Sequence, residues 1–147
     1  MFERVYVEMD WHDGWPREGI ADYQGKPHYF VRKFDEERDA FEDVFELRPV
    51  DAETLSIAIA SWRIFVAWND EYESGFAKTD SHPALPGVNP TYAMLEQKFH
   101  ARMRASFTTP IRATLTTQGV DVKNRRRYSD DGPDYRIEWK LLDGTSK

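Results

Sequence analysis

The sequence predicts an α+β fold, with a mostly antiparallel sheet packed against two helices at about 51–75 and 90–107. Three observations lead to this class. Alternating apolar and polar residues predict strands before residue 50 and again after residue 110. Two capped segments with helical periodicity lie between these strands. Because strands and helices are grouped along the chain, the alternating pattern of a doubly wound parallel sheet is absent.

The helix predicted over Asp51–Gly75 has the clearest signals in the chain. The Asp51 carboxylate can accept hydrogen bonds from the first free N–H groups, and Gly75 can adopt the positive φ that ends many helices. A second apolar set lies away from the main apolar stripe of this helix: Ile57, Ile64 and Trp68. We therefore expect burial on two sides, against the sheet and against a second helix, a covering loop or another protein.

The remaining elements follow from shorter patterns. Asn89 followed by Pro90 starts the second helix, and Pro110 ends that segment. A hairpin is expected around Gly25, in the Gln24–Pro27 loop. Longer loops are expected at Asp10–Gly19, Phe76–Val88 and Ser129–Asp134. Strands are expected at Phe2–Met9, Ile20–Tyr23, His28–Phe34, Asp43–Val50, Ile111–Thr116 and Tyr135–Leu141, with a short return strand at Val120 and Val122.

Composition favours a single domain over residues 1–147. Five Trp, seven Tyr and nine Phe provide large side chains for a core, and the absence of cysteine excludes disulfides and thiolate metal sites. Charges near the N-terminus argue against a signal peptide, and polar residues in the long helix argue against a membrane span, so we predict a cytoplasmic protein. Acidic residues dominate residues 1–53 and basic residues dominate residues 91–147, which can steer a charged partner or draw the two halves together.

The first candidate site combines the predicted loop from Asp10 to Arg17 with His28. Its candidate catalytic or binding residues are Asp10, His12, Asp13, Arg17 and His28. Carboxylate and imidazole groups there could bind a divalent metal or transfer a proton. The alternative is a tight turn in which Asp13 accepts backbone N–H groups and the tryptophans pack. The spacing matches no specific metal-ligand motif, so we assign no metal site and no cofactor.

The second candidate is a protein-binding surface of aromatic and acidic residues. Its residues are Trp11, Trp15, Trp68, Glu36, Glu37 and Asp39. The acidic stretch from Asp35 to Glu46 could dock a basic protein with a fast, salt-sensitive association rate, and a solvated acidic face is the alternative. His82, which precedes Pro83, and His100, in the second helix, are expected to have structural roles.

The third candidate is a basic run near the C-terminus: Lys123, Arg125, Arg126 and Arg127. Such a run, followed by Tyr128, could contact nucleic-acid phosphates if it joined Arg102 and Arg104 on one face. However, the chain is acidic overall and three aspartates follow directly. A solvated or acid-paired loop is the alternative, and we do not expect nucleic acid as a partner.

Three segments resemble a group of small bacterial proteins without an assigned activity: DGWPREGIADYQGKPHYF (Asp13 to Phe30), the run from Phe41 to Val50, and SHPALPG (Ser81 to Gly87). The resemblance covers residues 10–90 and leaves the C-terminal third unmatched. The pattern of the group runs aspartate, glycine, proline, arginine, whereas Trp15 stands before Pro16 in this sequence, so the loop conformation can differ. The resemblance implies no activity and no catalytic residue.

No nucleophile motif, phosphate-binding loop or dinucleotide fingerprint is present in the sequence, and we do not expect an enzyme. The leading hypothesis is a non-catalytic cytoplasmic protein of the accessory, immunity or adaptor kind, which binds another protein or a second copy of itself and no membrane. The rival hypothesis is a small enzyme or ligand-binding domain with a polar pocket at the Asp10–Arg17 loop and His28. A nucleic-acid accessory factor is the third hypothesis. An exposed Trp68 would favour the leading one.

Overall fold

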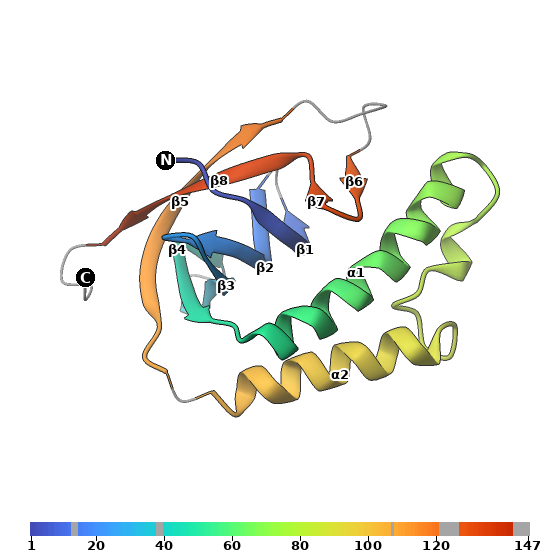
Figure 1. Ribbon diagram of the computed structural model, residues 1–147, viewed down its shortest axis with the longest axis horizontal. Coiled ribbons are helices and arrows are strands. Elements are labelled where there is room, and N and C mark those ends of the chain that lie inside the picture. The colour runs from blue at the N-terminus through green and yellow to red at the C-terminus, as the bar shows by residue number, and fades with distance from the viewer. Residues whose placement is uncertain (13–14, 38–39, 107, 121–126, 143–147) are drawn as a thin grey trace.

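The computed structural model describes residues 1–12, 15–37, 40–106, 108–120 and 127–142, and only the backbone of residues 11–12, 33–35 and 40–42. The elements in chain order are β1 (Val5–His12), β2 (Trp15–Tyr23), β3 (Lys26–Asp35), β4 (Ala40–Pro49), α1 (Ala52–Glu73), the 3-10 turn η1 (Thr79–Ser81), α2 (Pro90–Arg104), β5 (Ile111–Gly119), β6 (Tyr128–Ser129), β7 (Gly132–Pro133) and β8 (Tyr135–Leu141). The predicted class is confirmed, because an antiparallel sheet packs against two helices (Figure 1).

The six long strands form one curled antiparallel sheet in the order β1-β2-β3-β4-β5-β8. The last strand, β8, also meets the segment before β1, because the backbones of Glu3 and Ile137 exchange N–H···O bonds of 2.7 and 3.0 Å. The Phe30 ring on β3 lies 5.4 Å from the Trp139 ring on β8, although two strands separate β3 from β8 in the sheet. Such a contact requires the sheet to curl around an apolar interior, which therefore resembles a partly closed barrel.

A β-bulge in β1 sends two neighbouring valines to opposite faces of the sheet. Val5 lies opposite Ala21 but Val7 lies opposite Ile20, so β1 gains one residue relative to β2 between these pairs. Val5 consequently joins the interior core with Ala21, Tyr23, Phe30, Phe45, Leu47, Ala113, Tyr135 and Ile137. Val7 joins the core beneath the helices with Ile20, Val50, Ala58, Trp62, Val66, Phe99 and Met103.

The two helices begin where their caps predict. The Asp51 carboxylate accepts from the Thr54 N–H at 2.8 Å, and Asn89 accepts from the Tyr92 N–H at 2.9 Å. Gly75 follows α1 with a φ of 83°, a conformation that other residues adopt at a cost. The second helix ends at Arg104, three residues before the predicted end.

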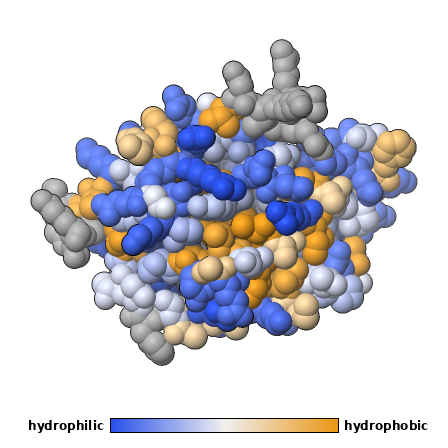
Figure 2. Space-filling model, viewed as in Figure 1, coloured by the Kyte–Doolittle hydropathy of each residue, from blue (hydrophilic) through white to orange (hydrophobic). Residues whose placement is uncertain are grey.

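Helix α1 is buried on two sides, as its double apolar pattern predicts. Trp62 and Val66 pack toward the sheet, and Ser61 contacts Glu96 of α2. Trp68 is covered within the chain, because its indole N–H donates to the Ser81 hydroxyl at 3.0 Å. Apolar residues gather over α1 and toward α2 in Figure 2, on the face that this view presents. The second apolar set, Ile57, Ile64 and Trp68, is half-buried.

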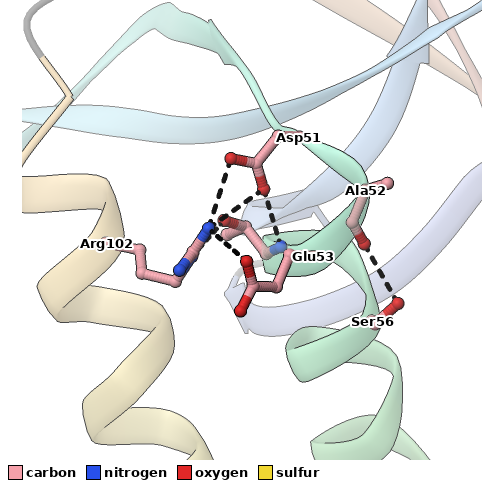
Figure 3. A network of polar contacts seen from close by, with 6 residues as sticks. Asp51, Ala52, Glu53, Ser56 and Arg102 are labelled. Carbon is pink, nitrogen blue, oxygen red and sulfur yellow. Dashed lines mark hydrogen bonds and ion pairs between the residues drawn. The ribbon is translucent and has the colours of Figure 1, made fainter.

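Arg102 of α2 fastens the C-terminal half of that helix to the start of α1 (Figure 3). Its Nε donates to the Thr54 hydroxyl at 2.6 Å, and its Nη2 lies 3.3 Å from carboxylate oxygens of both Asp51 and Glu53. The two acids also suit the positive end of the α1 dipole. Because α1 and α2 are joined at this end, they can diverge at the other, where the Phe76–Val88 segment connects them.

The prediction of a loop over Asp10–Gly19 is wrong for most of that range. β1 continues to His12 and β2 begins at Trp15, so these residues form a hairpin. Polar groups that favoured a loop are paired instead across strands, since Arg17 donates to Asp10 and the Tyr29 hydroxyl donates to Glu18. The prediction of a loop over Ser129–Asp134 is also wrong, because this range contains most of the β6–β7 hairpin.

The hairpin around Gly25 is confirmed. β2 and β3 pair up to Tyr23 and Lys26, which leaves Gln24 and Gly25 as a two-residue turn with φ values of 53° and 76°. Positive φ at both positions matches the hairpin turns that follow the twist of the strands. Val122 of the predicted return strand lies outside the described residues.

Candidate functional site

A pocket of about 280 Å³ lies where α1 and α2 diverge above the edge strand β1. Its lining comes from β1, α1, the connecting segment, α2 and β6: Val7, Glu8, Met9, Asp10, Ala58, Ser61, Trp62, Phe65, His82, Ala84, Tyr92, Glu96 and Tyr128. We call it the α1–α2 pocket. Its volume is near the lower limit for small-molecule sites and corresponds to the space of about nine waters.

Glu8 is a half-buried acid of this pocket. Its two carboxylate oxygens accept from the hydroxyls of Tyr128, at 2.9 Å, and Tyr135, at 3.0 Å. Burial raises the pKa of the Glu8 carboxyl, and the two phenol hydrogen bonds oppose that effect. Burial and the neighbouring Glu8 charge in turn raise the pKa of both tyrosines. Glu8 therefore holds the β6 side of the pocket against β1.

The same wall is fastened from α1. The Trp62 indole N–H donates to the Ser129 carbonyl at 2.7 Å, and its ring meets the Tyr128 ring edge-on at 5.4 Å. Phe65 packs against the same tyrosine, with ring centroids 5.2 Å apart. Trp62 is almost fully buried, so it serves as a fixed aromatic surface for the pocket.

Glu96 supplies a second carboxylate from α2. The Ser61 hydroxyl donates to one of its oxygens, and the His100 ring nitrogen lies 3.7 Å from the other. Burial first, and then the charge of Glu96, raise the pKa of the neighbouring Tyr92 to about 12. Tyr92 is therefore a neutral phenol at physiological pH, and the negative charge in this part of the pocket belongs to Glu96.

His82 closes the pocket from the connecting segment. Its Nδ1 accepts from the Ala84 N–H at 3.0 Å, which places the proton of the neutral ring on Nε2. The ring packs against Phe65 and Trp68, with centroid distances of 5.8 and 4.5 Å. Burial lowers the pKa of His82, so the ring is neutral at physiological pH and adds no positive charge.

The lining combines negative charge with aromatic faces. Glu8, Asp10 and Glu96 contribute carboxylates, Arg17 contacts the Asp10 carboxylate, and the Arg127 charge acts on Glu8 from outside the lining. Among the described lining residues there is no lysine or arginine. Aromatic faces and carboxylates together attract ammonium and guanidinium groups, and they repel anions.

The described residues of the first predicted site do not all lie together. Asp10 pairs with Arg17 and lines the α1–α2 pocket, whereas His28 lies opposite Ala21, three strand positions from the Glu18 that faces Asp10. His28 is buried instead against Tyr23 and interacts through Nδ1 with the Lys26 carbonyl. The His12 side chain and Asp13 lie outside the described residues.

The aromatic and acidic candidates also lie apart. Trp15 is 44% exposed on β2, and Trp68 packs between Tyr72 and His82 at the end of α1. Glu36 and Glu37 are exposed at the turn between β3 and β4. The Trp11 side chain and Asp39 lie outside the described residues.

Of the predicted basic run, only Arg127 is described, and Lys123, Arg125 and Arg126 lie outside. The Arg127 guanidinium stands 5.0 Å from the centroid of the Tyr128 ring. Arg102 is engaged with the start of α1, so it is held away from a phosphate-binding role by its own ion pairs. The nucleic-acid hypothesis stays a prediction without support from this geometry.

Sequence reasoning missed most residues of the pocket. Glu8 alternates with Val7 and Met9 and looks like a solvent-facing strand residue, yet it is enclosed because β6 and β7 lie beside β1. Tyr92 and Glu96 are one helical turn apart on α2, a spacing that shows they share a face. That spacing does not reveal Ser61, which comes from another helix.

Comparisons with protein-family models, curated proteins and solved structures find no match to this chain. The resemblance to small bacterial proteins therefore stays a prediction. Within the described part of the chain, no group of three or more His, Cys, Asp or Glu side chains is placed to hold a metal ion. Neither α1 nor α2 is long and apolar enough to cross a bilayer, and a cytoplasmic location stays a prediction.

Proposed function

We propose that the protein is a binding domain for a small organic cation, which occupies the α1–α2 pocket. The observation that supports this most is the composition of the lining, in which carboxylates and aromatic rings surround a space of about 280 Å³. The overall net charge of −6 adds a long-range attraction for cations. The proposal develops the ligand-binding hypothesis and moves its site from His28 to the helices.

Glu96 is the residue that we assign to the charged group of the ligand. Glu8 already accepts two phenol hydrogen bonds and Asp10 is paired with Arg17, so both have strong partners within the protein. Glu96 receives one short hydroxyl contact, from Ser61, and its other oxygen faces His100 at 3.7 Å. Neither contact is with a lysine or arginine, so the charge of the Glu96 carboxylate can attract a cationic group of the ligand.

The aromatic residues supply the second part of recognition. Trp62, Phe65, Tyr92 and Tyr128 come from three elements and line the same pocket. A cation over an aromatic face gains about 0.5–2 kcal/mol, more where water is excluded. Because these rings are held by packing and by the Trp62 and Tyr128 hydrogen bonds, little ordering is needed on binding.

Calorimetric titration with choline tests the proposal. Glu96→Gln should weaken choline binding by about 5- to 30-fold, the equivalent of roughly 1–2 kcal/mol, because it removes the carboxylate charge that attracts the trimethylammonium group. Phe65→Leu keeps an apolar side chain but removes one aromatic face, and it should weaken binding by about threefold or more.

Glu73→Gln is the matched control, because it removes the same charge from an exposed position at the end of α1. Its effect should be small and should disappear in physiological salt. Equal losses in the Glu96 and Glu73 variants would leave only a general charge effect and would overturn the proposed pocket.

A second candidate function is protein binding, the leading hypothesis from the sequence. The observation that favours it is a group of exposed apolar residues around the connection between the helices: Tyr72, Phe76, Leu85, Val88 and Met94. Phe76 is 86% exposed, which is unusual for a phenylalanine away from an interface. If a second copy of the chain covers this region, sedimentation of the native protein should show dimers that Phe76→Ser abolishes.

A further inference from the structure

A second recess, separate from the α1–α2 pocket, opens on the interior face of the curled sheet. It has a volume of about 260 Å³, and the described residues that line it are Trp15, Arg32, Asp43, Phe45, Thr114 and Leu115. We propose that this recess, which we call the barrel mouth, binds a small amphiphilic carboxylic acid. Arg32 would receive the carboxylate, and the apolar body of the ligand would lie on Trp15, Phe45 and Leu115.

The strand register places Arg32 inside the sheet. Arg32 lies directly opposite Phe45, and Phe45 lies opposite Ala113 on β5. Residues that face each other across antiparallel strands share one face of the sheet. Phe45 and Ala113 belong to the interior core, so Arg32 lies on the interior face, level with Phe45 and two residues beyond Phe30 on β3.

The floor of this recess is apolar, and apolar side chains also stand beside the polar lining residues Arg32, Asp43 and Thr114. The Phe45 ring is almost fully buried and packs edge-on against Phe30 and Trp139, which close the interior below it. Leu115 packs against the same core from β5. Trp15, at 44% exposure, offers a large aromatic surface at the rim. Open ends of small barrels commonly hold one small ligand in such surroundings.

Arg32 is paired with an exposed carboxylate, that of Asp43, which a ligand can replace. The Arg32 side chain is 16% exposed, and its Nη2 lies 2.8 Å from a carboxylate oxygen of Asp43, whose side chain is 94% exposed. An ion pair with so exposed a partner contributes about 0–1 kcal/mol. A ligand carboxylate can therefore replace Asp43 on Arg32 while Asp43 returns to water, and the guanidinium remains compensated.

This chemistry favours a ligand with a single negative charge. A carboxylate matches the planar fork of the guanidinium and takes the place of one carboxylate already there. A phosphate would bring a second negative charge beside Asp43, in a chain whose net charge is already −6. Trp15, Phe45 and Leu115 favour an alkyl or aryl body on the ligand, because burying apolar surface against them is favourable.

The test is calorimetric titration of the native protein with octanoate and with octanamide, its uncharged counterpart. We expect octanoate to bind at least tenfold more tightly than octanamide. Arg32→Gln should abolish that preference and leave octanamide binding unchanged. Asp43→Asn should strengthen octanoate binding severalfold, because it removes the competing carboxylate, and an exposed side chain can be changed without risk to the fold.

Asp131→Asn, an exposed change at the turn between β6 and β7, serves as the matched charge control and should leave octanoate binding as in the native protein. Equal affinities for octanoate and octanamide would overturn the proposal, and so would an Asp43→Asn variant that binds octanoate no better than the control. If Arg32→Gln fails to fold, the Asp43 variant alone decides. The proposal does not depend on the cation pocket, which these variants leave intact.

Discussion

Phe99 is the residue through which α2 is anchored on the sheet, and its truncation to alanine should be costly. The ring is fully buried among Val7, Ile20 and Trp62, and it meets the Tyr29 ring of β3 edge-on with centroids 5.4 Å apart. Truncation of a buried phenylalanine costs about 3–5 kcal/mol, from lost apolar transfer energy and from the cavity that remains. The free energy of unfolding of a small domain is about 5–15 kcal/mol, so this loss removes a substantial fraction of the stability.

Urea denaturation followed by tryptophan fluorescence measures this loss. Phe99→Ala should lower the unfolding midpoint without changing the slope, and it should lower the melting temperature by roughly 6–20 °C, at about 2–4 °C per kcal/mol for a chain of this length. Met94→Ala is the control on the same helix, since Met94 is 47% exposed, and it should change stability by less than about 0.5 kcal/mol.

The Phe99 result also bears on the pocket. α2 carries Tyr92 and Glu96 into the lining, so a helix that is held by Phe99 keeps the binding groups in place. A loss below about 1 kcal/mol for Phe99→Ala would mean that α2 is not docked as described, because no fully buried phenylalanine is truncated so cheaply. The pocket wall that contains Glu96 would then not be held in place by Phe99.

The remaining predictions concern Glu8 and Gly132. Burial raises the folded pKa of Glu8 above its ordinary value of 4.5, so its contribution to stability is present below that value and is lost as pH rises through the folded pKa. Glu8→Gln should therefore gain stability relative to the native protein between pH 4 and pH 7 in urea titrations, and a constant difference would refute the assignment. Gly132 has a φ of 119°, and an added Cβ would stand 2.3 Å from the Val5 carbonyl oxygen, so Gly132→Ala should cost about 2 kcal/mol or more in the same assay. At Gly119 the nearest atom lies 4.0 Å away, and Gly119→Ala should be neutral or slightly stabilising; equal effects of the two changes would contradict the close approach of β7 to β1.

Local chemistry explains why the helices could be predicted. Asp51 and Asn89 cap their own backbones within three residues, and Gly75 ends α1 through its own φ, so no distant contact is needed to place these boundaries. The β-hairpin at Gly25 depends on two residues for the same reason. The two-sided burial of α1 could also be predicted, because the helical period reports which residues share a side.

Contacts between distant segments explain what could not be predicted. The hairpin of β1 and β2 runs through a polar stretch that looks like a loop, because its charges pair across strands. The bulge between Val5 and Val7 reverses which face each residue occupies, and alternation alone gives the wrong face for one of them. Glu8 is enclosed by tyrosines 120 and 127 residues away in the chain. A pocket built from five segments has no local signature.

The most direct test of the central claim is a calorimetric comparison of two ligands of the same shape on the native protein. One is choline, and the other is its carbon counterpart, in which a tert-butyl group replaces the trimethylammonium group. If Glu96 and the aromatic rings recognise an organic cation, choline should bind at least about tenfold more tightly, a difference of about 1.4 kcal/mol. Equal binding of the two compounds, or no binding of choline, would contradict the proposed function.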